Sequence, residues 1–202
     1  METKLYSTID ILEIVEQIKA DNLIAFPTDT VFGLAGNLTL AALNNLKKAK
    51  GRPADKPFPI MVSNIEMIKT IAMVNQQEEA VIRTLMPGAL TIILNKKKDL
   101  ADIFTNNQDS VAIRMPNDKF ILELINRINN PIMVSSANVS GNSNTTNTEE
   151  VLEQLKGKIS GVVAGVSGGS LPSTIVDCRD GIKILRNGEI TLANIKEVLN
   201  ER

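Results

Sequence analysis

The sequence predicts an α/β fold in which a twisted, mixed β-sheet is flanked by helices. Three observations carry this prediction: short apolar runs that suit buried strands, intervening segments with apolar residues at helical spacing, and helix-capping residues at the boundaries. The 202 residues are 43% hydrophobic, which is ample for a sizeable core, and no low-complexity linker divides them. We therefore predict a single domain over residues 1–202.

The first three predicted elements are a helix, a strand and a second helix. Ser7 and Asp10 form a capping-box pattern at the start of the first helix. The apolar stripe of this helix consists of Ile11, Leu12, Val15 and Ile18. A strand over 23–26 follows, and Pro27 ends it because proline cannot donate to a continuing ladder. The second helix is predicted over 39–50, where a threonine supplies the cap.

Strands and helices alternate through the middle of the chain. Strands are predicted over 58–62, 89–94, 111–115 and 132–134, and helices over 63–72, 76–85 and 120–128. Ser63 and Glu66 supply a capping pattern for the first of these helices, and Pro87-Gly88 predicts a turn. The three lysines over 96–98 lie between a strand and a loop, so we expect a solvated turn there.

The C-terminal part predicts a helix, a strand, a hairpin and a final helix. These elements are expected over 149–155, 161–164, 174–178 with 182–185, and from Thr191 onward. Residues 142–148 are Asn, Ser and Thr only, which is typical of a mobile loop that can order over a ligand. Gly168 and Gly169 would let backbone amides approach an anion, although a glycine-rich turn alone is weak support for such a site.

Composition excludes several function classes. The chain has no histidine, which removes Ser-His and Cys-His nucleophile pairs, an imidazole general base and histidine-rich zinc sites. A formal net charge of -1 and an aromatic content of 3% argue against general binding of nucleic acid, although a local patch allows a weak RNA contact. If the protein is an enzyme, we expect it to act by positioning and by fixed charges and dipoles.

Three further features bear on localisation. The single cysteine, Cys178, cannot form an internal disulfide and lies in a predicted strand, where a packed, inert thiol is expected. No apolar run approaches the length that spans a membrane, and the N-terminus lacks the pattern of a signal peptide. We therefore predict a cytoplasmic protein with no membrane partner.

A threonine-rich turn and a basic loop form the candidate site. Thr28, Asp29 and Thr30 follow the first predicted strand, and Arg52 and Lys56 lie among prolines that stiffen the loop. A stiff loop loses less entropy when it holds an anion. The same residues are also compatible with a turn whose hydroxyls satisfy nearby backbone groups and with solvated cations.

Six motifs, in order along the chain, resemble those of the YrdC/TsaC family of threonylcarbamoyl-AMP synthases. They are Pro27-Thr-Asp-Thr-Val-Phe-Gly-Leu34, Lys50-Gly-Arg52-Pro, Val111-Ala-Ile-Arg-Met-Pro116, Ser135-Ser-Ala-Asn-Val-Ser-Gly141, Ser173-Thr-Ile-Val-Asp177 and Ile184-Leu-Arg186. The resemblance covers about residues 9–199 and implies a YrdC-like fold with a concave, basic cavity.

The resemblance also implies an activity. The family joins L-threonine, bicarbonate and ATP into threonylcarbamoyl-AMP and releases pyrophosphate, and the product feeds threonylcarbamoyladenosine (t6A) modification of tRNA. Downstream tRNA threonylcarbamoyl-transfer proteins are the implied partners. Mg2+ is expected to arrive with ATP on its phosphates, without a dedicated metal site in the protein.

The site residues that the resemblance implies fall into three groups. Lys50 and Arg52 match the catalytic motif and also contact nucleotide. The substrate-binding group consists of Thr30, Arg114, Ser136 and Ser173. The remaining nucleotide-binding residues are Lys56, Ser110, Asn138, Thr146 and Arg186. Arg114 suits a bidentate clamp on the threonine carboxylate, while a buried ion pair with a protein carboxylate is the alternative role.

The chain departs from the family pattern in places, and other functions stay open. Met61 stands where many relatives carry a histidine, Phe32 replaces a common tyrosine and Ala89 a common proline. One alternative is a non-catalytic module that binds double-stranded or ribosomal RNA. Another is a carbamoyl-transfer domain like that of hydrogenase maturation proteins, although the acylphosphatase and zinc-finger segments of those proteins are absent from this sequence.

Overall fold

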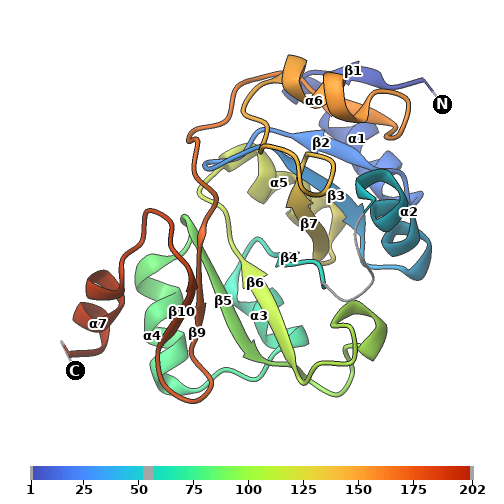
Figure 1. The fold of residues 1–202 in the computed structure, drawn as a ribbon. Helices are drawn as coiled ribbons and strands as arrows, with labels where there is room; N and C mark the ends of the chain where they lie inside the picture. Colours follow the sequence, from blue (N-terminus) through green and yellow to red (C-terminus); the bar gives the residue numbers. More distant parts are fainter. Residues whose placement is uncertain (1, 52–56, 201–202) are drawn as a thin grey trace.

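The fold is built on one extended β-sheet. The computed structural model describes residues 2–51 and 57–200, and within them ten strands form a sheet of order β1-β8-β2-β3-β7-β4-β6-β5-β9-β10 (Figure 1). The strands are β1 (Lys4–Tyr6), β2 (Ile24–Phe26), β3 (Gly33–Asn37), β4 (Ile60–Met61), β5 (Leu90–Asn95), β6 (Ser110–Arg114), β7 (Ile132–Ser136), β8 (Gly161–Val163), β9 (Thr174–Asp177) and β10 (Lys183–Arg186). Because β1 pairs with β8 in parallel and β3 pairs with β7 antiparallel, the sheet is mixed, as predicted.

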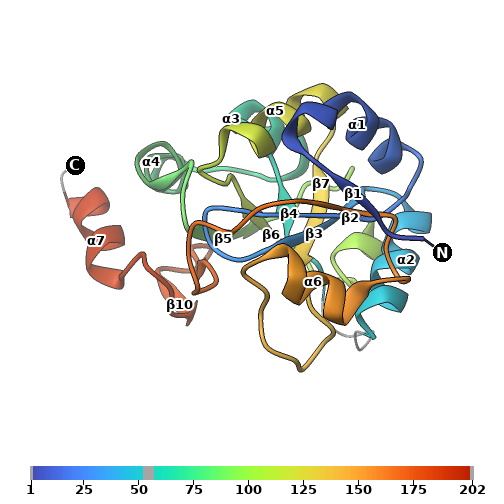
Figure 2. The ribbon, with the colours of Figure 1, turned by 90° about the horizontal axis from the view of Figure 1, so that it is seen from above.

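Helices cover both faces of this sheet. They are α1 (Ile11–Lys19), α2 (Leu40–Lys50), α3 (Ile65–Ile71), α4 (Gln76–Leu85), α5 (Lys119–Ile128), α6 (Thr148–Leu155) and α7 (Leu192–Asn200). Figure 2 shows α1, α3 and α5 on one face and α2 and α6 on the other. The predicted α/β fold with flanking helices is confirmed, whereas the single domain over 1–202 stays a prediction. None of the described helices combines the length and hydropathy needed to cross a bilayer, and the cytoplasmic location stays a prediction.

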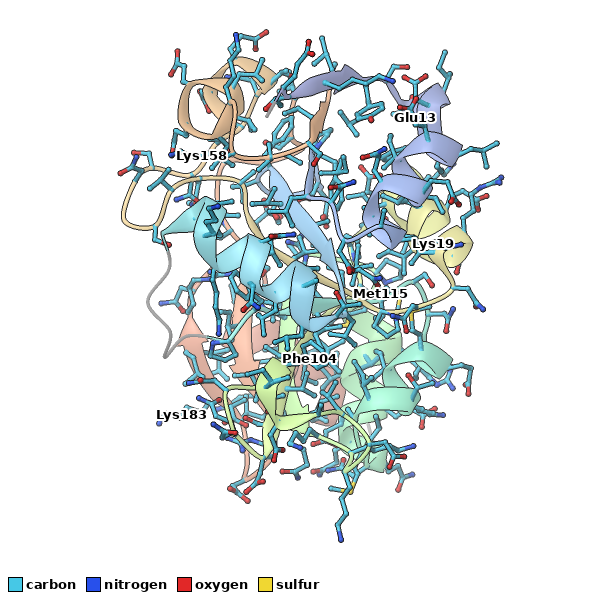
Figure 3. The ribbon with its side chains drawn as sticks, turned by 90° about the vertical axis from the view of Figure 1, so that its right-hand side faces the viewer. Glu13, Lys19, Phe104, Met115, Lys158 and Lys183 are labelled. Atoms are coloured by element: carbon cyan, nitrogen blue, oxygen red, sulfur yellow. The ribbon has the colours of Figure 1, made fainter. Side chains whose placement is uncertain are left out.

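Clusters of buried apolar side chains hold the helices against the sheet. Ile14 of α1 and Ile125 of α5 belong to one cluster, and Leu46 of α2 belongs to another that packs on the opposite face. In Figure 3, Met115 lies inside the molecule, in agreement with its burial, while Lys183 lies at the surface. Removal of this apolar surface from water is the main term that favours the fold.

Capping residues and turn signals locate several elements correctly. The Thr39 hydroxyl accepts a hydrogen bond from the Ala42 amide at 3.1 Å, and the Thr191 hydroxyl accepts one from the Asn194 amide at 3.2 Å. Both threonines therefore cap the helices predicted from them. The predicted C-terminal hairpin is formed by antiparallel pairing of β9 with β10.

Two strands, β1 and β3, are absent from the sequence prediction. The sequence of β3 is Gly-Leu-Ala-Gly-Asn, which has low intrinsic strand propensity. It forms a strand because β2 and β7 pair with it on its two sides. A Cβ atom at Gly33 would lie 2.9 Å from Val134 Cγ1, so the close packing of these strands requires glycine there.

Two helix details differ from the prediction. Leu12 is 65% exposed, and the buried stripe of α1 includes Ile14 instead. Helix α3 is capped by Asn64 and not by Ser63, since the Asn64 Oδ1 atom accepts a hydrogen bond from the Met67 amide at 2.8 Å. The buried stripe of α1 is set by packing against the rest of the fold, whereas the cap of α3 is a local bond one residue after the predicted one.

Two segments predicted to be solvated or mobile make specific contacts. Lys96 is only partly exposed, and its Nζ atom lies 2.7 Å from Asp102 Oδ1. Within 142–148, Thr145 is fully buried, and its hydroxyl donates to the Ala137 carbonyl at 2.9 Å. The second half of this segment is therefore anchored to the end of β7.

A small acidic cluster lies between α4 and the end of β9. Burial, together with the charges of Glu78 and Asp177, raises the pKa of the Cys178 thiol to about 12. The thiolate is therefore scarce at neutral pH, in keeping with the predicted inert thiol. Glu78 is 3% exposed, and its carboxylate accepts a hydrogen bond from the Asn75 amide at 2.7 Å. Burial raises the pKa of Glu78, and this hydrogen bond opposes the shift.

We predict that Glu78→Gln raises the melting temperature at pH 7.5. A raised pKa means that the native state holds the proton more tightly than the unfolded chain, so the associated stability is present below the ordinary glutamate pKa and is lost as the pH rises through the raised value. Glutamine keeps an acceptor for the Asn75 amide and removes the buried charge. Thermal unfolding by circular dichroism should show that the gain disappears at about pH 4.

The matched control is Glu79→Gln in the same turn of α4. The Arg83 guanidinium donates to Glu79 from Nε at 2.8 Å and lowers the pKa of that carboxyl, so neutralisation should slightly lower the melting temperature at pH 7.5. Equal responses of the two variants would contradict the sign assigned to Glu78.

Candidate active site

A cavity of about 340 Å3 lies where β3, β7, β6, β5 and β9 come together. Its polar lining comprises Thr28, Thr30, Thr91, Arg114, Ser135, Ser136, Asn144, Ser173 and Arg186. Apolar side chains, among them Phe32, Met61 and Val134, form much of the remaining wall. Among the described lining residues there is no carboxylate and no lysine, so arginines are the only charged groups there. The cavity is within the size range of small-ligand sites.

The turn between β2 and β3 presents its threonines to this cavity. The Thr28 hydroxyl donates to the Val31 carbonyl at 2.8 Å and accepts from the Thr30 amide at 3.0 Å. Such bonds satisfy backbone groups of the turn, which is the structural role that the sequence allows for these threonines besides an anion site. The two interpretations are compatible, because Thr28 and Thr30 also line the cavity.

A glycine-rich segment between β8 and β9 crosses over this turn. The Gly168 amide donates to the Thr28 carbonyl at 2.8 Å, and the Gly169 amide donates to the Thr30 carbonyl at 3.0 Å. These amides therefore bond to the turn and are not available for the anion contact that the glycine-rich sequence would permit. A Cβ atom at Gly168 would lie 3.2 Å from Asp29 Cα, which explains why glycine suits this crossing.

Arg114 projects from β6 and is held by the turn. Its Nη2 atom donates to Asp29 Oδ1 at 2.6 Å, and its Nη1 atom donates to Thr30 Oγ1 at 2.7 Å. The second oxygen of Asp29 accepts from the Asn117 amide at 3.1 Å. The ion pair considered for Arg114 is thus present and largely buried, and Arg114 also lines the cavity, whereas its contact with a threonine carboxylate stays a prediction.

Opposing effects act on the pKa of Arg114, which is 6% exposed. Burial lowers this pKa, the charge of Asp29 raises it, and the charge of nearby Arg186 lowers it. An arginine remains charged at neutral pH despite such a shift. The Arg114 Nε atom is buried without a hydrogen-bond partner in the described part of the chain. An unsatisfied buried donor is unusual in a native protein, and a ligand in the cavity is one group that could accept from it.

The facing wall carries a second polar group. The Thr91 and Ser173 hydroxyls lie 2.7 Å apart, and the Arg186 Nη2 atom donates to Ser173 Oγ at 3.1 Å. The Nε atom of Arg186 also donates to the Ser173 carbonyl at 2.9 Å. The structure therefore gathers the following predicted site residues around one cavity: Thr30, Arg114, Ser136, Ser173 and Arg186.

Lys50 and Asn138 contact Ser136 at the end of β7 and are not among the lining residues. Lys50 is 2% exposed, and its Nζ atom donates to the Ser136 carbonyl and, at 2.7 Å, to the Asn138 carbonyl. The Ser140 amide donates to the Lys50 carbonyl at 2.8 Å. These bonds fasten the C-terminal turn of α2 to the segment after β7, so Lys50 has at least a structural role.

The other predicted nucleotide residues are spread more widely. Ser110 lines a separate cavity of about 70 Å3, which shares Pro57 with the larger one. The Thr146 hydroxyl donates to Glu150 Oε2 at 3.2 Å, and Thr146 is not among the cavity residues. Arg52 and Lys56 lie outside the described residues. The predicted concave basic cavity therefore stays a prediction, since Arg114 and Arg186 are its described cations.

Two contributors were not assigned a site role by sequence reasoning. Thr91 is a threonine within an otherwise apolar strand, and a polar residue in a buried run is the signal that could have marked it. Its position opposite Arg114 in the β5–β6 register then places it beside the site. Asp29 was named only as part of the threonine-rich turn, and its pairing with Arg114 was not predicted because the two residues are 85 positions apart in sequence.

Comparison with known proteins identifies the family. The sequence profile for Sua5/YciO/YrdC proteins, described as telomere recombination, matches residues 16–188. The chain belongs to the Sua5/YciO/YrdC family. Threonylcarbamoyl-AMP synthases from Pyrococcus abyssi and Bacillus subtilis are 35% and 36% identical over 91% and 90% of this chain, but over only 55% and 54% of their own lengths. This Sua5/YciO/YrdC chain thus spans about half the length of these curated relatives.

A solved structure supports the same placement. The crystal structure of P. abyssi Sua5 complexed with L-threonine has a TM-score of 0.92 with this chain at 32% identity, covering 98% of this chain and 62% of that one. The Sua5/YciO/YrdC fold is therefore shared over nearly the whole of the chain.

We predict that Asp29→Asn destabilises this Sua5/YciO/YrdC chain strongly. The Asp29 and Arg114 side chains are 14% and 8% exposed, and removal of one charge leaves the other buried without its counter-ion. Loss of one partner from such a pair costs about 3 kcal/mol of unfolding free energy. Urea unfolding at pH 7 measures this cost.

Asp102→Asn is the matched control for this experiment. Asp102 pairs with Lys96 at 2.7 Å, but its side chain is 69% exposed, so the cost should stay below about 1 kcal/mol. A similar loss for the two variants would mean that the Asp29–Arg114 pair is no more than a surface contact.

Proposed function

We propose that this protein is a threonylcarbamoyl-AMP synthase that joins L-threonine, bicarbonate and ATP and releases pyrophosphate. The names of its relatives and the six-motif resemblance support the proposal. The observation that carries it is the cavity that gathers Arg114 with the hydroxyls of Thr30 and Ser173. L-Threonine is the ligand of the P. abyssi structure, and we assign it to this cavity.

The amino-acid end of the cavity has suitable chemistry for threonine. A carboxylate can accept from the N–H groups of Arg114 that Asp29 and Thr30 leave unused, because a guanidinium has five donors. The small aliphatic side chain of threonine matches the apolar wall that includes Met61 and Val134. Met61 thus lines the cavity at the position where many relatives carry a histidine, and it offers contact with a methyl group in place of a hydrogen bond.

The reaction balances without a basic side chain. The threonine amine attacks the carbonyl carbon of bicarbonate, a C–N bond forms, and water leaves to give the carbamate. A carbamate oxygen then attacks the α-phosphorus of ATP, and the bond to pyrophosphate breaks. Bicarbonate, phosphate or solvent can accept the ammonium proton, and Asp29 is the alternative acceptor in the protein. Catalysis then consists of positioning and electrostatic stabilisation.

We assign the nucleotide to the side of the cavity near Ser136 and Arg186. Lys50 and Asn138 contact Ser136, Ser110 lines the adjoining cavity, and the segment with Arg52 and Lys56 follows directly after α2 in sequence. Mg2+ would enter as part of the ATP complex and be held by phosphate oxygens. The product carries an activated acyl group, so the next reaction is an acyl transfer, and the family resemblance implies a tRNA adenosine as the acceptor and a partner enzyme as the catalyst.

The direct test is an assay with purified protein, ATP, labelled bicarbonate and L-threonine. We expect pyrophosphate to appear only when all three substrates are present, together with a labelled nucleotide product. ATP turnover that ignores threonine would contradict the proposal. Salt-sensitive RNA affinity with no pyrophosphate would favour the RNA-binding alternative.

We predict that Arg114→Lys lowers kcat/KM for threonine at least about a hundredfold, which corresponds to roughly 2.7 kcal/mol. A lysine ammonium cannot bond Asp29, Thr30 and a ligand carboxylate in the planar arrangement of a guanidinium. Initial rates of pyrophosphate release at varied threonine concentration measure the effect.

Arg179→Lys provides the matched control. Arg179 also makes a two-point contact with a carboxylate, since its Nε and Nη2 atoms donate to Asp177 at 2.9 and 2.7 Å, but it lies in the hairpin between β9 and β10. Its variant should keep kcat/KM within about twofold of the parent protein. An equal effect of the two substitutions would remove Arg114 from the threonine site.

A further inference from the structure

We propose that Thr28 is a positioning residue, whose hydroxyl orients that of Thr30 and thereby fixes the guanidinium of Arg114 in the cavity. The inference rests on the proposed function only where threonine kinetics are used. It follows from the direction of each hydrogen bond in a buried chain of four groups.

The proton of Thr28 has a single available direction. Its hydroxyl lies 2.8 Å from the Val31 carbonyl oxygen, which can only accept, so Thr28 must be the donor in that bond. The Thr30 amide donates to the same hydroxyl oxygen at 3.0 Å. Thr28 therefore has no proton left for its third neighbour, the Thr30 hydroxyl.

The direction of the Thr30 proton follows from that of Thr28. The two hydroxyl oxygens lie 3.1 Å apart, so Thr30 donates and Thr28 accepts. The Thr30 oxygen then presents lone pairs on its other side, where Arg114 Nη1 donates to it at 2.7 Å. The bonds run in one direction, from Arg114 through Thr30 and Thr28 to the Val31 carbonyl. In such a chain each bond polarises the next.

Burial prevents water from replacing these partners. Thr28 and Thr30 are 2% and 0% exposed, and Arg114 is 6% exposed. The glycine segment fixes the turn from outside through the Gly168 amide. The chain also ends on a backbone carbonyl, which takes no proton at neutral pH, so Thr28 serves to orient groups and does not carry protons away.

The consequence is a two-point hold on the guanidinium. Asp29 accepts from Nη2 and Thr30 accepts from Nη1, and these neighbouring residues belong to the same turn. Without the Thr28 hydroxyl, the Thr30 hydroxyl proton loses its acceptor, and the Thr30 side chain is free to rotate about χ1 and leave Arg114. Asp29 alone would then hold the guanidinium, and its plane could turn about that single contact.

The test compares Thr28→Val, which has nearly the same shape, with Thr28→Ser, which restores the hydroxyl. In Thr28→Val we expect KM for threonine to rise roughly tenfold, with KM for ATP and kcat changed less than about threefold, and Thr28→Ser should recover most of the loss. Thr39→Val is the matched control. The Thr39 hydroxyl likewise donates once and accepts once, at the start of α2, so its loss should lower stability and leave KM for threonine unchanged.

A second measurement does not depend on the activity. In protein labelled with 15N-arginine, hindered rotation should give separate Nη signals for Arg114, and Thr28→Val should merge them, while Thr39→Val should not. Unchanged signals in Thr28→Val would overturn the inference, and so would a loss of kcat in this variant with no change in KM for threonine. If the parent protein releases no pyrophosphate, the proposed function fails, and the nitrogen spectra alone decide the role of Thr28.

Discussion

The cavity depends on the cost of burying the Arg114 guanidinium. A charge that is taken out of water must be compensated by a counter-ion and by hydrogen bonds, or it becomes strongly destabilising. The turn between β2 and β3 supplies both, through the Asp29 carboxylate and the Thr30 hydroxyl. This turn comes from one half of the sheet and Arg114 from the other, so the ion pair also joins the two halves across the cavity. The Asp29–Arg114 ion pair therefore both holds the two halves of the sheet together and fixes the guanidinium that lines the cavity.

A second buried cation has a comparable role on the other side of β7. Lys50 donates to backbone carbonyls at the end of that strand, and the amide of Ser140 returns a bond to Lys50. Backbone carbonyls accept from this ammonium, whereas the Asp29 carboxylate accepts from Arg114. The bonds of Lys50 hold the backbone of Ser136, a residue that lines the cavity, although the Lys50 side chain is not among the lining residues.

Local sequence signals predicted the helices well because caps and apolar periodicity are local properties, as Thr39 and Thr191 illustrate. They failed for β3, whose glycines are tolerated only because two partner strands enclose it. For the site, motif order pointed to Thr30, Arg114 and Ser173, which the fold brings together around one cavity. The contact of Asp29 with Arg114 and the place of Thr91 opposite Arg114 could not be predicted, because both depend on strand register. Register is set by long-range pairing that no short motif encodes.

Compensation of Arg114 by Asp29 also limits what the site can do with anions. A ligand carboxylate beside Arg114 shares one positive charge with Asp29, so the pair alone offers little net attraction. The surplus must come from Arg186, whose charge is close enough to lower the pKa of Arg114 and whose Nη2 atom bonds Ser173. The two arginines then have different roles: Arg114 offers hydrogen bonds of fixed geometry, and Arg186 adds net positive charge. Binding of a zwitterionic amino acid depends mainly on hydrogen-bond geometry, while binding of a polyphosphate depends mainly on net positive charge. Under the proposed function, this division would assign the carboxylate of the amino acid to Arg114 and the phosphates of the nucleotide to the neighbourhood of Arg186, because a reaction between them requires the two substrates side by side.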